Sequence, residues 1–402
     1  MAITYQESTR TFFLDGKGVT YAFCVNDYDY LEHLYFGKII GHDDIRYIRG
    51  CGGTDNNPKI PGVKMEVGYA YGSLDSYQYF APELAFFGTG DYREPAVQIK
   101  TEKGDRPEVL ISGEEIIKPG AADIVLLCTD SFTKNAFPRL KFVMEQGINV
   151  ITSAEEMAYP AAQEPELAAE LDRIAKENGV TCLGTGINPG HIMDLLVLVM
   201  TGCLTDVEEI TSRRVNSLSP FGPAVMEEQG IGISVEEFKE RKANGTMSGH
   251  VGFAESVGMI AAGLGLEVSE FSQDMNPITT DVDRKSPYGF AAAGSCAGVA
   301  MTAEAVLDNG MKVHMDHPQQ IEPEQVGVQT GDYVIIKGTP NVNMVNSPEV
   351  EGGLGTIAMC VNMIPQVINA DPGLKTMLDL PVPRAIMGDM RDRICPDKKI
   401  VK

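Results

Sequence analysis

The pattern of apolar and polar positions changes character near residue 120. Before that point, short aromatic and β-branched stretches at 11–14 and 19–25 flank the turn sequence Asp15-Gly16-Lys17-Gly18. Such a turn between two strand-like stretches predicts a β-hairpin. Because no stretch before residue 115 has a helical period, we expect an all-β region over residues 1–115.

From residue 122, strand and helix patterns alternate. Residues 123–128 form a continuous apolar run, which is typical of a strand buried on both faces. Glycines at 147 and 179 follow stretches of helical spacing and are common helix ends. The pattern predicts helices at 132–146, 164–178 and 192–200 and strands at 123–128, 148–152 and 180–183. This order implies right-handed β-α-β units in a parallel sheet.

A third pattern begins at residue 207, where longer strand candidates are interrupted by single helices. It predicts strands at 207–215, 266–283, 295–307, 311–316 and 332–337, and helices at 234–243, 253–264 and 354–369. We therefore expect an α+β domain with a mostly antiparallel sheet.

Composition narrows the class of ligand. The net charge of −23 would repel a phosphate backbone, so nucleic acid is not an expected partner, whereas a cationic or zwitterionic small molecule is. The polar N-terminus and the absence of a run of about 20 apolar residues indicate a cytoplasmic protein without a membrane span. The eight cysteines form no C-x-x-C pair, so we expect buried, reduced thiols and no metal site.

Polar residues follow three strands of the predicted parallel sheet, where ligands of such sheets bind. The third strand end has glycines in a G-x-G-x-x-x-G spacing, a weak match to a dinucleotide fingerprint. It indicates either a helix N-terminus that holds an anion or a tight crossover loop with positive φ at its glycines. The candidates at these ends are Thr129, Asp130, Ser131, Ser153, Glu155, Glu156, Gly184, Gly186, Asn188 and Gly190.

Charged pairs supply the candidate chemistry. Glu155 and Glu156 either bind a substrate ammonium or open a solvated loop. Arg213 and Arg214 are consecutive in a strand and point to opposite faces, so one of them could bind a carboxylate.

His191 and Asp194 lie three residues apart on a predicted helix and therefore share a face. Either His191 is a base that Asp194 orients, or His191 is a histidine that caps the helix. His250, His314 and His317 have no other potential metal ligands at a suitable spacing and are interpreted as structural. The loop 216–230 is rich in small and acidic residues and could close over a substrate.

Residues 117–394 closely resemble the 2,4-diaminopentanoate dehydrogenases, which are related in fold to dihydrodipicolinate reductase. The resemblance is carried by ADIVLLCTDSF (122–132), NVITSAEEMAYP (149–160), LGTGINPG (183–190), RRVNSLSPFGPAVMEEQGIG (213–232) and LPVPRAIMGDMRD (380–392). It implies a homo-oligomeric enzyme that deaminates 2,4-diaminopentanoate oxidatively at C4, with NAD or NADP as hydride acceptor. It also implies that the segment after Pro381 packs back onto the cofactor domain.

The resemblance assigns roles to the candidates. Glu155, Glu156 or His191 would be the base, and Arg213 or Arg214 would bind the substrate carboxylate. Asn216, Ser219 and Glu227 would line the pocket. Thr129, Asp130, Ser131, Ser153, Gly184, Gly186, Asn188 and Gly190 would border the cofactor.

The N-terminal third resembles a different family, the N-terminal β-sandwich of bacterial α-galactosidases. ITYQESTRTFFL (3–14), YLEHLYFGK (30–38) and FFGTGDYREPAV (86–97) carry this resemblance, and no glycosidase barrel follows them. In the dehydrogenases this region holds the first β-α-β unit with its G-x-G-x-x-G loop, which is missing from its expected place. Impaired dinucleotide binding is one consequence. A non-catalytic fusion whose sandwich serves assembly or weak carbohydrate contact is the alternative.

Together these observations predict a multidomain chain. Residues 1–115 form an all-β, sandwich-like region. Residues 116–190, with 375–402 packing back, form a partial Rossmann domain. Residues 191–374 form an α+β domain for substrate binding and oligomerisation.

Overall fold

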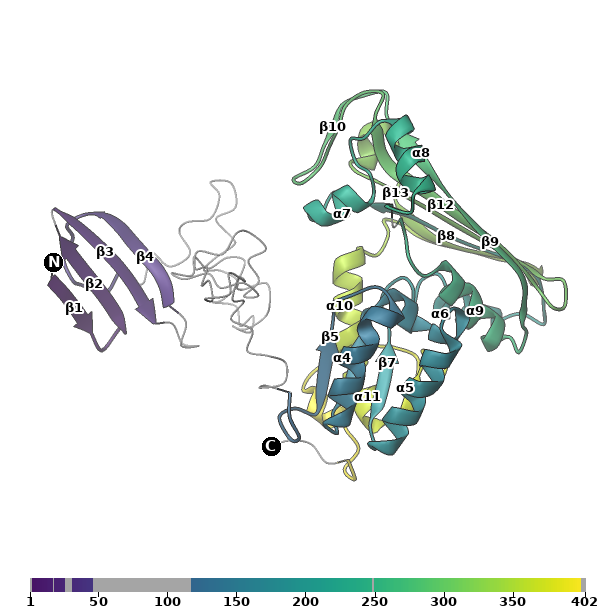
Figure 1. Ribbon diagram of the computed structural model, residues 1–402, viewed down its shortest axis with the longest axis horizontal. Helices are drawn as coiled ribbons and strands as arrows, with labels where there is room; N and C mark the ends of the chain where they lie inside the picture. Colours follow the sequence, from purple (N-terminus) through teal and green to yellow (C-terminus); the bar gives the residue numbers. More distant parts are fainter. Residues whose placement is uncertain (1, 17, 26–30, 46–116, 248, 399–402) are drawn as a thin grey trace. The chain divides into compact units, whose positions relative to one another are not determined.

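The computed structural model describes residues 2–16, 18–25, 31–45, 117–247 and 249–398. The chain divides into two compact units, Met1–Glu115 and Ile116–Lys402 (Figure 1). The galactosidase-like stretch 86–97 lies outside the described residues.

The described part of the first unit is an antiparallel sheet. Its strands β1 (Ala2–Gln6), β2 (Thr11–Gly16), β3 (Val19–Val25) and β4 (Leu31–Lys38) pair in sequence order. Gly16 pairs with Val19 across the turn, and Gly18 has a φ of +84°, so the predicted hairpin is confirmed. Alternate residues of the strands, with Ile45, form a small apolar core: Phe13, Ala22, Cys24, Leu34 and Ile45. The expectation of β structure is therefore confirmed here as one antiparallel sheet.

The second unit contains a parallel sheet in the order β16-β7-β6-β5. Its strands are β5 (Ile124–Leu127), β6 (Asn149–Thr152), β7 (Thr181–Gly184) and β16 (Gly373–Lys375). The connecting helices are α4 (Thr133–Glu145) and α5 (Pro165–Glu177). Gly147 and Gly179 follow these helices with φ of +71° and +67°, as the helix ends require. The predicted β-α-β units are confirmed; the short strand β16 was not predicted.

Helices cover both faces of this sheet because successive strand residues point to opposite sides. Val150 and Cys182 pack against α4 and α5. Ile151 and Leu183 face the other layer, where α10 (Gly352–Asn362) and α11 (Ile364–Asn369) lie. The single helix predicted over 354–369 is thus two helices, and Pro365, which has no N–H to donate, stands in the first turn of the second.

The second sheet of this unit is mixed, in the order β15-β14-β8-β13-β12-β9, and only β8 and β13 pair in parallel. Helices α6 (Leu195–Thr201), α8 (Val235–Ala243) and α9 (Phe253–Gly263) pack against it around a large apolar core (Figure 1). The strands are β8 (Asp206–Ser217), β9 (Val268–Thr279), β12 (Cys296–Leu307), β13 (Lys312–Gln320), β14 (Gly331–Thr339) and β15 (Val342–Asn346). The mostly antiparallel sheet is confirmed. The elements that were not predicted are β15, α7 (Pro223–Glu228), the hairpin β10 (Arg284–Lys285) and β11 (Phe290–Ala291), and the 3-10 turns η2 (Glu155–Ala158), η3 (Pro160–Ala162), η4 (Pro323–Val326) and η5 (Met390–Arg393).

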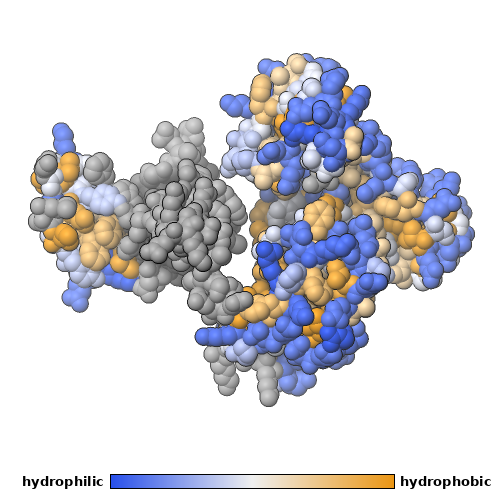
Figure 2. Space-filling view, in the orientation of Figure 1, coloured by the Kyte–Doolittle hydropathy of each residue, from blue (hydrophilic) through white to orange (hydrophobic). Residues whose placement is uncertain are grey.

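On the face drawn in Figure 2, hydrophilic residues cover much of this unit, with apolar patches between them. The prediction that the cysteines are buried is wrong for Cys128, Cys203 and Cys395, which are exposed. Cys128 directly follows the end of β5 and Cys203 lies beyond α6, so neither is covered by the core of its element. No helix in the described part of the chain is long and apolar enough to span a bilayer.

Candidate active site

A cavity of about 250 Å³ lies in the second unit, bordered by the carboxyl ends of β5, β6 and β7 and by β8 and β13. We call it the central cavity. This size suits a small molecule of a few heavy atoms. It is lined by Ser131, Phe132, Glu155, Ile187, Asn188, Arg214, Asn216, Leu218, Phe221, Val225, Glu228, Gln229, Gly249, His250, Val251, His317, Gln319, Gly352 and Thr356.

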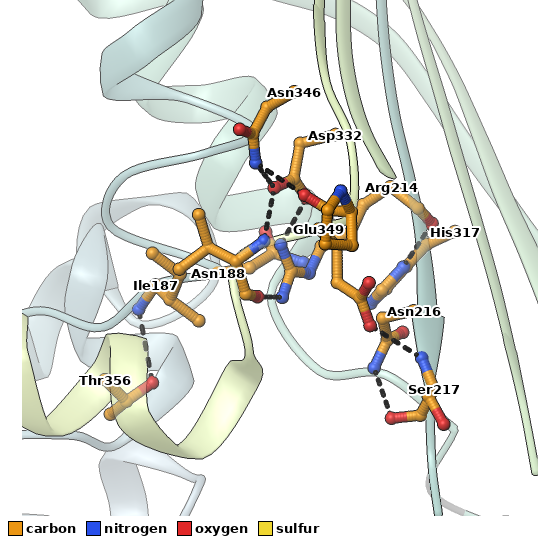
Figure 3. Close-up of polar contacts among 12 residues, drawn as sticks. Ile187, Asn188, Arg214, Asn216, Ser217, His317, Asp332, Asn346, Glu349 and Thr356 are labelled. Atoms are coloured by element: carbon orange, nitrogen blue, oxygen red, sulfur yellow. Dashed lines mark hydrogen bonds and ion pairs between the residues drawn. The ribbon is translucent and has the colours of Figure 1, made fainter. Parts of the chain in front are cut away.

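Arg214 is the buried cation of the cavity, with 2% of its surface exposed. One guanidinium nitrogen donates to the buried carboxylate of Asp332, and the other donates to the Val350 carbonyl at 2.5 Å (Figure 3). Asp332 also accepts bonds from Val350 N at 2.9 Å and from Asn346 Nδ2 at 3.2 Å. These contacts fix the position of the guanidinium and leave further N–H groups for a ligand.

Arg213 points away from the central cavity, as its adjacent strand position requires. Its side chain is 46% exposed, donates to Asp316 Oδ2 at 2.9 Å and lies over the Tyr333 ring. Of the two arginine candidates, the structure therefore brings only Arg214 to the cavity.

The two glutamates after β6 have different environments. Glu155 lines the central cavity, and burial raises the pKa of its carboxyl, with Asp130 and Glu228 adding to the rise and a Ser131 hydrogen bond opposing it. Glu156 instead accepts a hydrogen bond from Thr133 N at 2.7 Å, at the start of α4. Glu155 is therefore available to a ligand, whereas Glu156 binds a backbone N–H group at the N-terminus of α4.

His191 and Asp194 do not lie on a helix, because α6 begins only at Leu195. The buried Asp194 carboxylate accepts bonds from Leu195 N at 2.6 Å, Gly190 N at 2.7 Å and Ser256 Oγ at 2.9 Å. It therefore caps α6 and occupies the N–H groups that an anion would need. His191 does not line the cavity, and burial lowers the pKa of its ring against the opposing effect of Asp194 and Asp332.

The glycine-rich loop after β7 is shaped by close backbone contacts. A Cβ at Gly184 would lie 2.0 Å from the Met157 carbonyl oxygen, and one at Gly190 would lie 2.6 Å from Gly186 N. Only Gly190 of the three glycines has a positive φ, of +118°. The contacts explain Gly184 and Gly190 by packing of the crossover loop, while Asn188 of this loop reaches the cavity.

Neutral polar groups border the strand ends beside the cavity. Thr129 is exposed after β5, Ser131 lines the cavity and Ser153 follows β6. Asp130 is used locally, since its Oδ1 accepts Phe132 N at 2.9 Å. The hydroxyl groups of this edge are of a kind that can hydrogen-bond a nicotinamide amide or a ribose. The strand β5, which precedes Thr129, is the last strand of the parallel sheet: among the described residues it pairs only with β6.

Cys128 lies at the same edge and carries a perturbed thiol. Hydrogen bonds from the Cys360 thiol and from Ser153 lower its pKa to about 6, against the effect of burial.

Several cavity residues escaped the sequence interpretation. His317 donates through Nδ1 to the Arg214 carbonyl at 2.8 Å and contacts the His250 ring edge-to-face at 4.7 Å. Burial lowers the pKa of both rings, that of His250 to about 3, so both are neutral. For His317 the available signal was its place on β13, two residues before Gln319, in the strand that pairs with the β8 strand of Arg214 and Asn216. His250 lies outside the strands, and the sequence offered no such signal for it.

Glu228 lines the cavity, whereas the predicted Glu227 is exposed outside it. Both belong to α7, where successive residues differ in direction by about 100°. Ser219 is also outside the cavity; its Oγ accepts Glu322 N at 2.8 Å. In the part of the chain that the structure describes, no group of three or more His, Cys, Asp or Glu side chains could hold a metal ion.

Comparison with known proteins identifies relatives in two different families. Residues 191–395 match the model of the 2,4-diaminopentanoate dehydrogenase C-terminal domain. The 2,4-diaminopentanoate dehydrogenase of Acetoanaerobium sticklandii is 69% identical over 306 residues, which are 76% of this chain and 87% of that protein. The structure of an amine dehydrogenase from Mycobacterium smegmatis is similar with a TM-score of 0.60 and 27% identity, over 66% of this chain and 77% of that one.

A further match is to the bifunctional alpha-galactosidase/sucrose kinase of Mediterraneibacter gnavus, which is 36% identical over 118 residues. These are 29% of this chain and only 12% of that protein. The galactosidase likeness is thus confined to a small part of its relative, whereas the dehydrogenase likeness spans most of both chains. The chain belongs to the 2,4-diaminopentanoate dehydrogenase family.

Proposed function

We propose that the protein is an NAD- or NADP-dependent amino acid dehydrogenase that converts 2,4-diaminopentanoate to 2-amino-4-oxopentanoate and ammonia. Family membership supports the reaction class. The observation that carries the assignment is the pairing, in one small cavity, of a fixed guanidinium with two carboxylates, Glu155 and Glu228. A substrate with one carboxylate and two ammonium groups has the complementary charges.

Arg214 would bind the substrate carboxylate. Asp332 and Val350 hold the guanidinium in place, so little side-chain entropy is lost when a second carboxylate binds. The carboxylate end of the substrate would then lie over β8, and the opposite end would reach toward the strand ends of the parallel sheet.

Glu155 would remove a proton from the C4 ammonium, which frees the nitrogen lone pair for hydride loss from C4. The raised pKa of Glu155 lies closer to neutral pH than that of a free carboxyl, and a general base is most effective when its pKa is near the operating pH. When bound, NAD or NADP supplies the hydride acceptor. Glu228 would favour the iminium cation that remains, to which water adds before ammonia leaves.

The cofactor would lie along the edge formed by Thr129, Ser131, Ser153 and Asn188, with Gly186 allowing close approach. Asp130, Gly184 and Gly190 would shape this edge, since their contacts are internal. Because the chain has no G-x-G-x-x-G loop in the expected place, several backbone N–H donors to the pyrophosphate are missing. Each charge-assisted hydrogen bond contributes about 1.5 to 3 kcal/mol, so we expect weak dinucleotide affinity.

Steady-state oxidation tests the assignment, with NADH or NADPH absorbance and released ammonia as readouts. Glu155→Gln should lower kcat by about 100-fold or more, because a positioned base contributes at least this factor. Glu227→Gln changes an exposed residue of α7 outside the cavity, so it is the matched control and should leave kcat unchanged. Equal activity of both variants would contradict the role of Glu155. Titration of NADH and NADPH fluorescence in the unaltered chain measures the cofactor affinity separately.

The 36% identity of part of the chain to a galactosidase favours a separate role for the first unit. We propose that its antiparallel sheet belongs to a β-sandwich that serves assembly or weak carbohydrate contact. Residues 116–190 with 375–402 would form the cofactor domain, and residues 191–374 the substrate and oligomerisation domain of a homo-oligomer. Size-exclusion chromatography with light scattering tests the oligomer; a monomer at micromolar concentration would contradict it.

A further inference from the structure

Three amide side chains of the central cavity have no assigned role in the reaction described above. Asn216, Gln229 and Gln319 all line the cavity, and each is more than nine-tenths buried. Each has one polar atom without a hydrogen-bond partner, namely Asn216 Oδ1, Gln229 Oε1 and Gln319 Nε2. We call these residues the amide cluster. An unsatisfied buried polar atom is costly, so a cluster of them at a cavity indicates a polar ligand.

The orientation of two of these amides is fixed by their other contacts. Gln229 Nε2 donates to the Gly249 carbonyl at 2.8 Å, and Asn216 Nδ2 donates toward the Ser217 carbonyl at 3.4 Å. Since a carbonyl can only accept, the nitrogen must face it and the amide oxygen is left free. The cluster therefore offers at least two hydrogen-bond acceptors and no formal charge.

The sheet places the amide cluster next to Arg214. Asn216 follows Arg214 by two residues on β8, about 7 Å further along the strand. Both side chains are therefore on the same face of the sheet (Figure 3). Gln319 is the partner of Asn216 on the neighbouring strand β13. A ligand whose carboxylate binds Arg214 would offer that carboxylate to Gln319 Nε2 as well, and would hold a group on the adjacent carbon against Asn216.

The two carboxylates of the cavity belong to a different set of elements. Glu155 is in η2 and Glu228 is in α7, and they are close enough for Glu228 to affect the titration of Glu155. A carboxylate can take a proton from an ammonium, whereas a neutral amide oxygen can only accept a hydrogen bond from it. An ammonium that must stay protonated therefore suits the amides, and one that must be deprotonated suits Glu155.

We propose that the two free amide oxygens of the amide cluster, Asn216 Oδ1 and Gln229 Oε1, hold the C2 ammonium of the substrate beside its carboxylate on Arg214, and thereby direct oxidation to C4. This inference rests on the proposed function and deepens it. The α-amino acid end would be anchored on the mixed sheet as an intact zwitterion, and only the C4 ammonium would reach Glu155.

The test compares two ligands that differ only in the C2 ammonium, 2,4-diaminopentanoate and 4-aminopentanoate. Isothermal titration calorimetry measures their binding to the full chain, and the unaltered chain should bind the diamine more tightly. Asn216→Leu and, separately, Gln229→Leu should weaken diamine binding about 10- to 100-fold, because each removes one free amide oxygen that could accept a charge-assisted hydrogen bond from the ammonium. Binding of 4-aminopentanoate should change less than twofold.

Gln273→Leu is the matched control, since Gln273 is an exposed residue of β9 in the same sheet, outside the cavity. Melting temperatures close to that of the unaltered chain verify that each variant is folded. Equal losses for both ligands, unchanged diamine binding, or a lack of preference in the unaltered chain would overturn the inference. Selective diamine binding without oxidation by either cofactor would refute the proposed function and leave the ammonium site standing.

Discussion

Glu255 should make the stability of the protein depend on pH in a way that a single substitution removes. The side chain is fully buried in α9. Its Oε1 accepts Gln163 Nε2 at 2.7 Å, and its Oε2 is buried without a partner. Burial raises the pKa of this carboxyl from 4.5 to about 7, with Glu156 adding to the rise and the Gln163 bond opposing it.

The sign follows from proton binding in the two states. Between pH 4.5 and 7 the folded state holds the Glu255 proton and the unfolded state loses it, so the free energy of unfolding falls as pH rises through this range. At about 1.4 kcal/mol per pKa unit, the loss between pH 5 and pH 8 is about 2 to 3 kcal/mol. Glu255→Gln keeps the acceptor for Gln163 and has no proton to lose. Between pH 5 and pH 8, the free energy of unfolding of Glu255→Gln should therefore rise by this amount relative to that of the unaltered chain.

Urea denaturation at pH 5, 6, 7 and 8 measures the effect, and a relative shift in melting temperature of about 5 °C should accompany it. Other buried acids, such as Glu155 and Asp194, are present in both proteins, so their contributions cancel in the difference. Glu166→Gln removes an exposed carboxyl of α5 and serves as control. If the unaltered chain and Glu255→Gln have parallel pH profiles, Glu255 is ionised normally and the reasoning is refuted.

Three further results are expected. Gly184→Ala should lower the free energy of unfolding by about 3 kcal/mol, because its Cβ would meet a backbone oxygen at 2.0 Å, whereas Gly353→Ala, in a helix with open space around it, should be neutral or stabilising in the same denaturation assay. Iodoacetamide at pH 7 should label Cys128 faster than Cys203 by mass spectrometry, since the lowered pKa populates its thiolate; equal rates would contradict this. The chain should not hydrolyse a chromogenic α-galactoside above a no-enzyme control, because hydrolysis needs two carboxylates on a suitable scaffold.

The hydrophobic pattern was sufficient to predict most strands and helices of the second unit, because buried runs and glycine stops are local signals. The β-α-β segment from 123 to 183 was confirmed for this reason. The helix α6 was predicted to begin three residues early, since the Asp194 side chain ends the preceding loop by capping contacts that periodicity does not reveal. Strand β16 was missed because three residues paired with β7 carry no period of their own.

The candidate site was predictable only in part, because the sequence gives residue types but not directions. Alternation in β8 required Arg213 and Arg214 to diverge, and it could not say which of them faces the cavity. Nor could the sequence distinguish Glu155 from Glu156, since both begin a 3-10 turn and only the fold shows that Glu156 meets the start of α4.

The amide cluster was the least predictable part of the site, because nothing in the sequence indicates that its residues lie together. Asn216 and Gln319 are about a hundred residues apart and meet only because β8 and β13 pair in parallel. That pairing is the single parallel one in an otherwise antiparallel sheet, and it brings two strand ends of the same direction to the cavity. If an antiparallel strand took the place of β13, the amino end of that strand would lie beside Asn216. The recognition of a zwitterion proposed here therefore depends on the topology of the sheet as much as on the side chains.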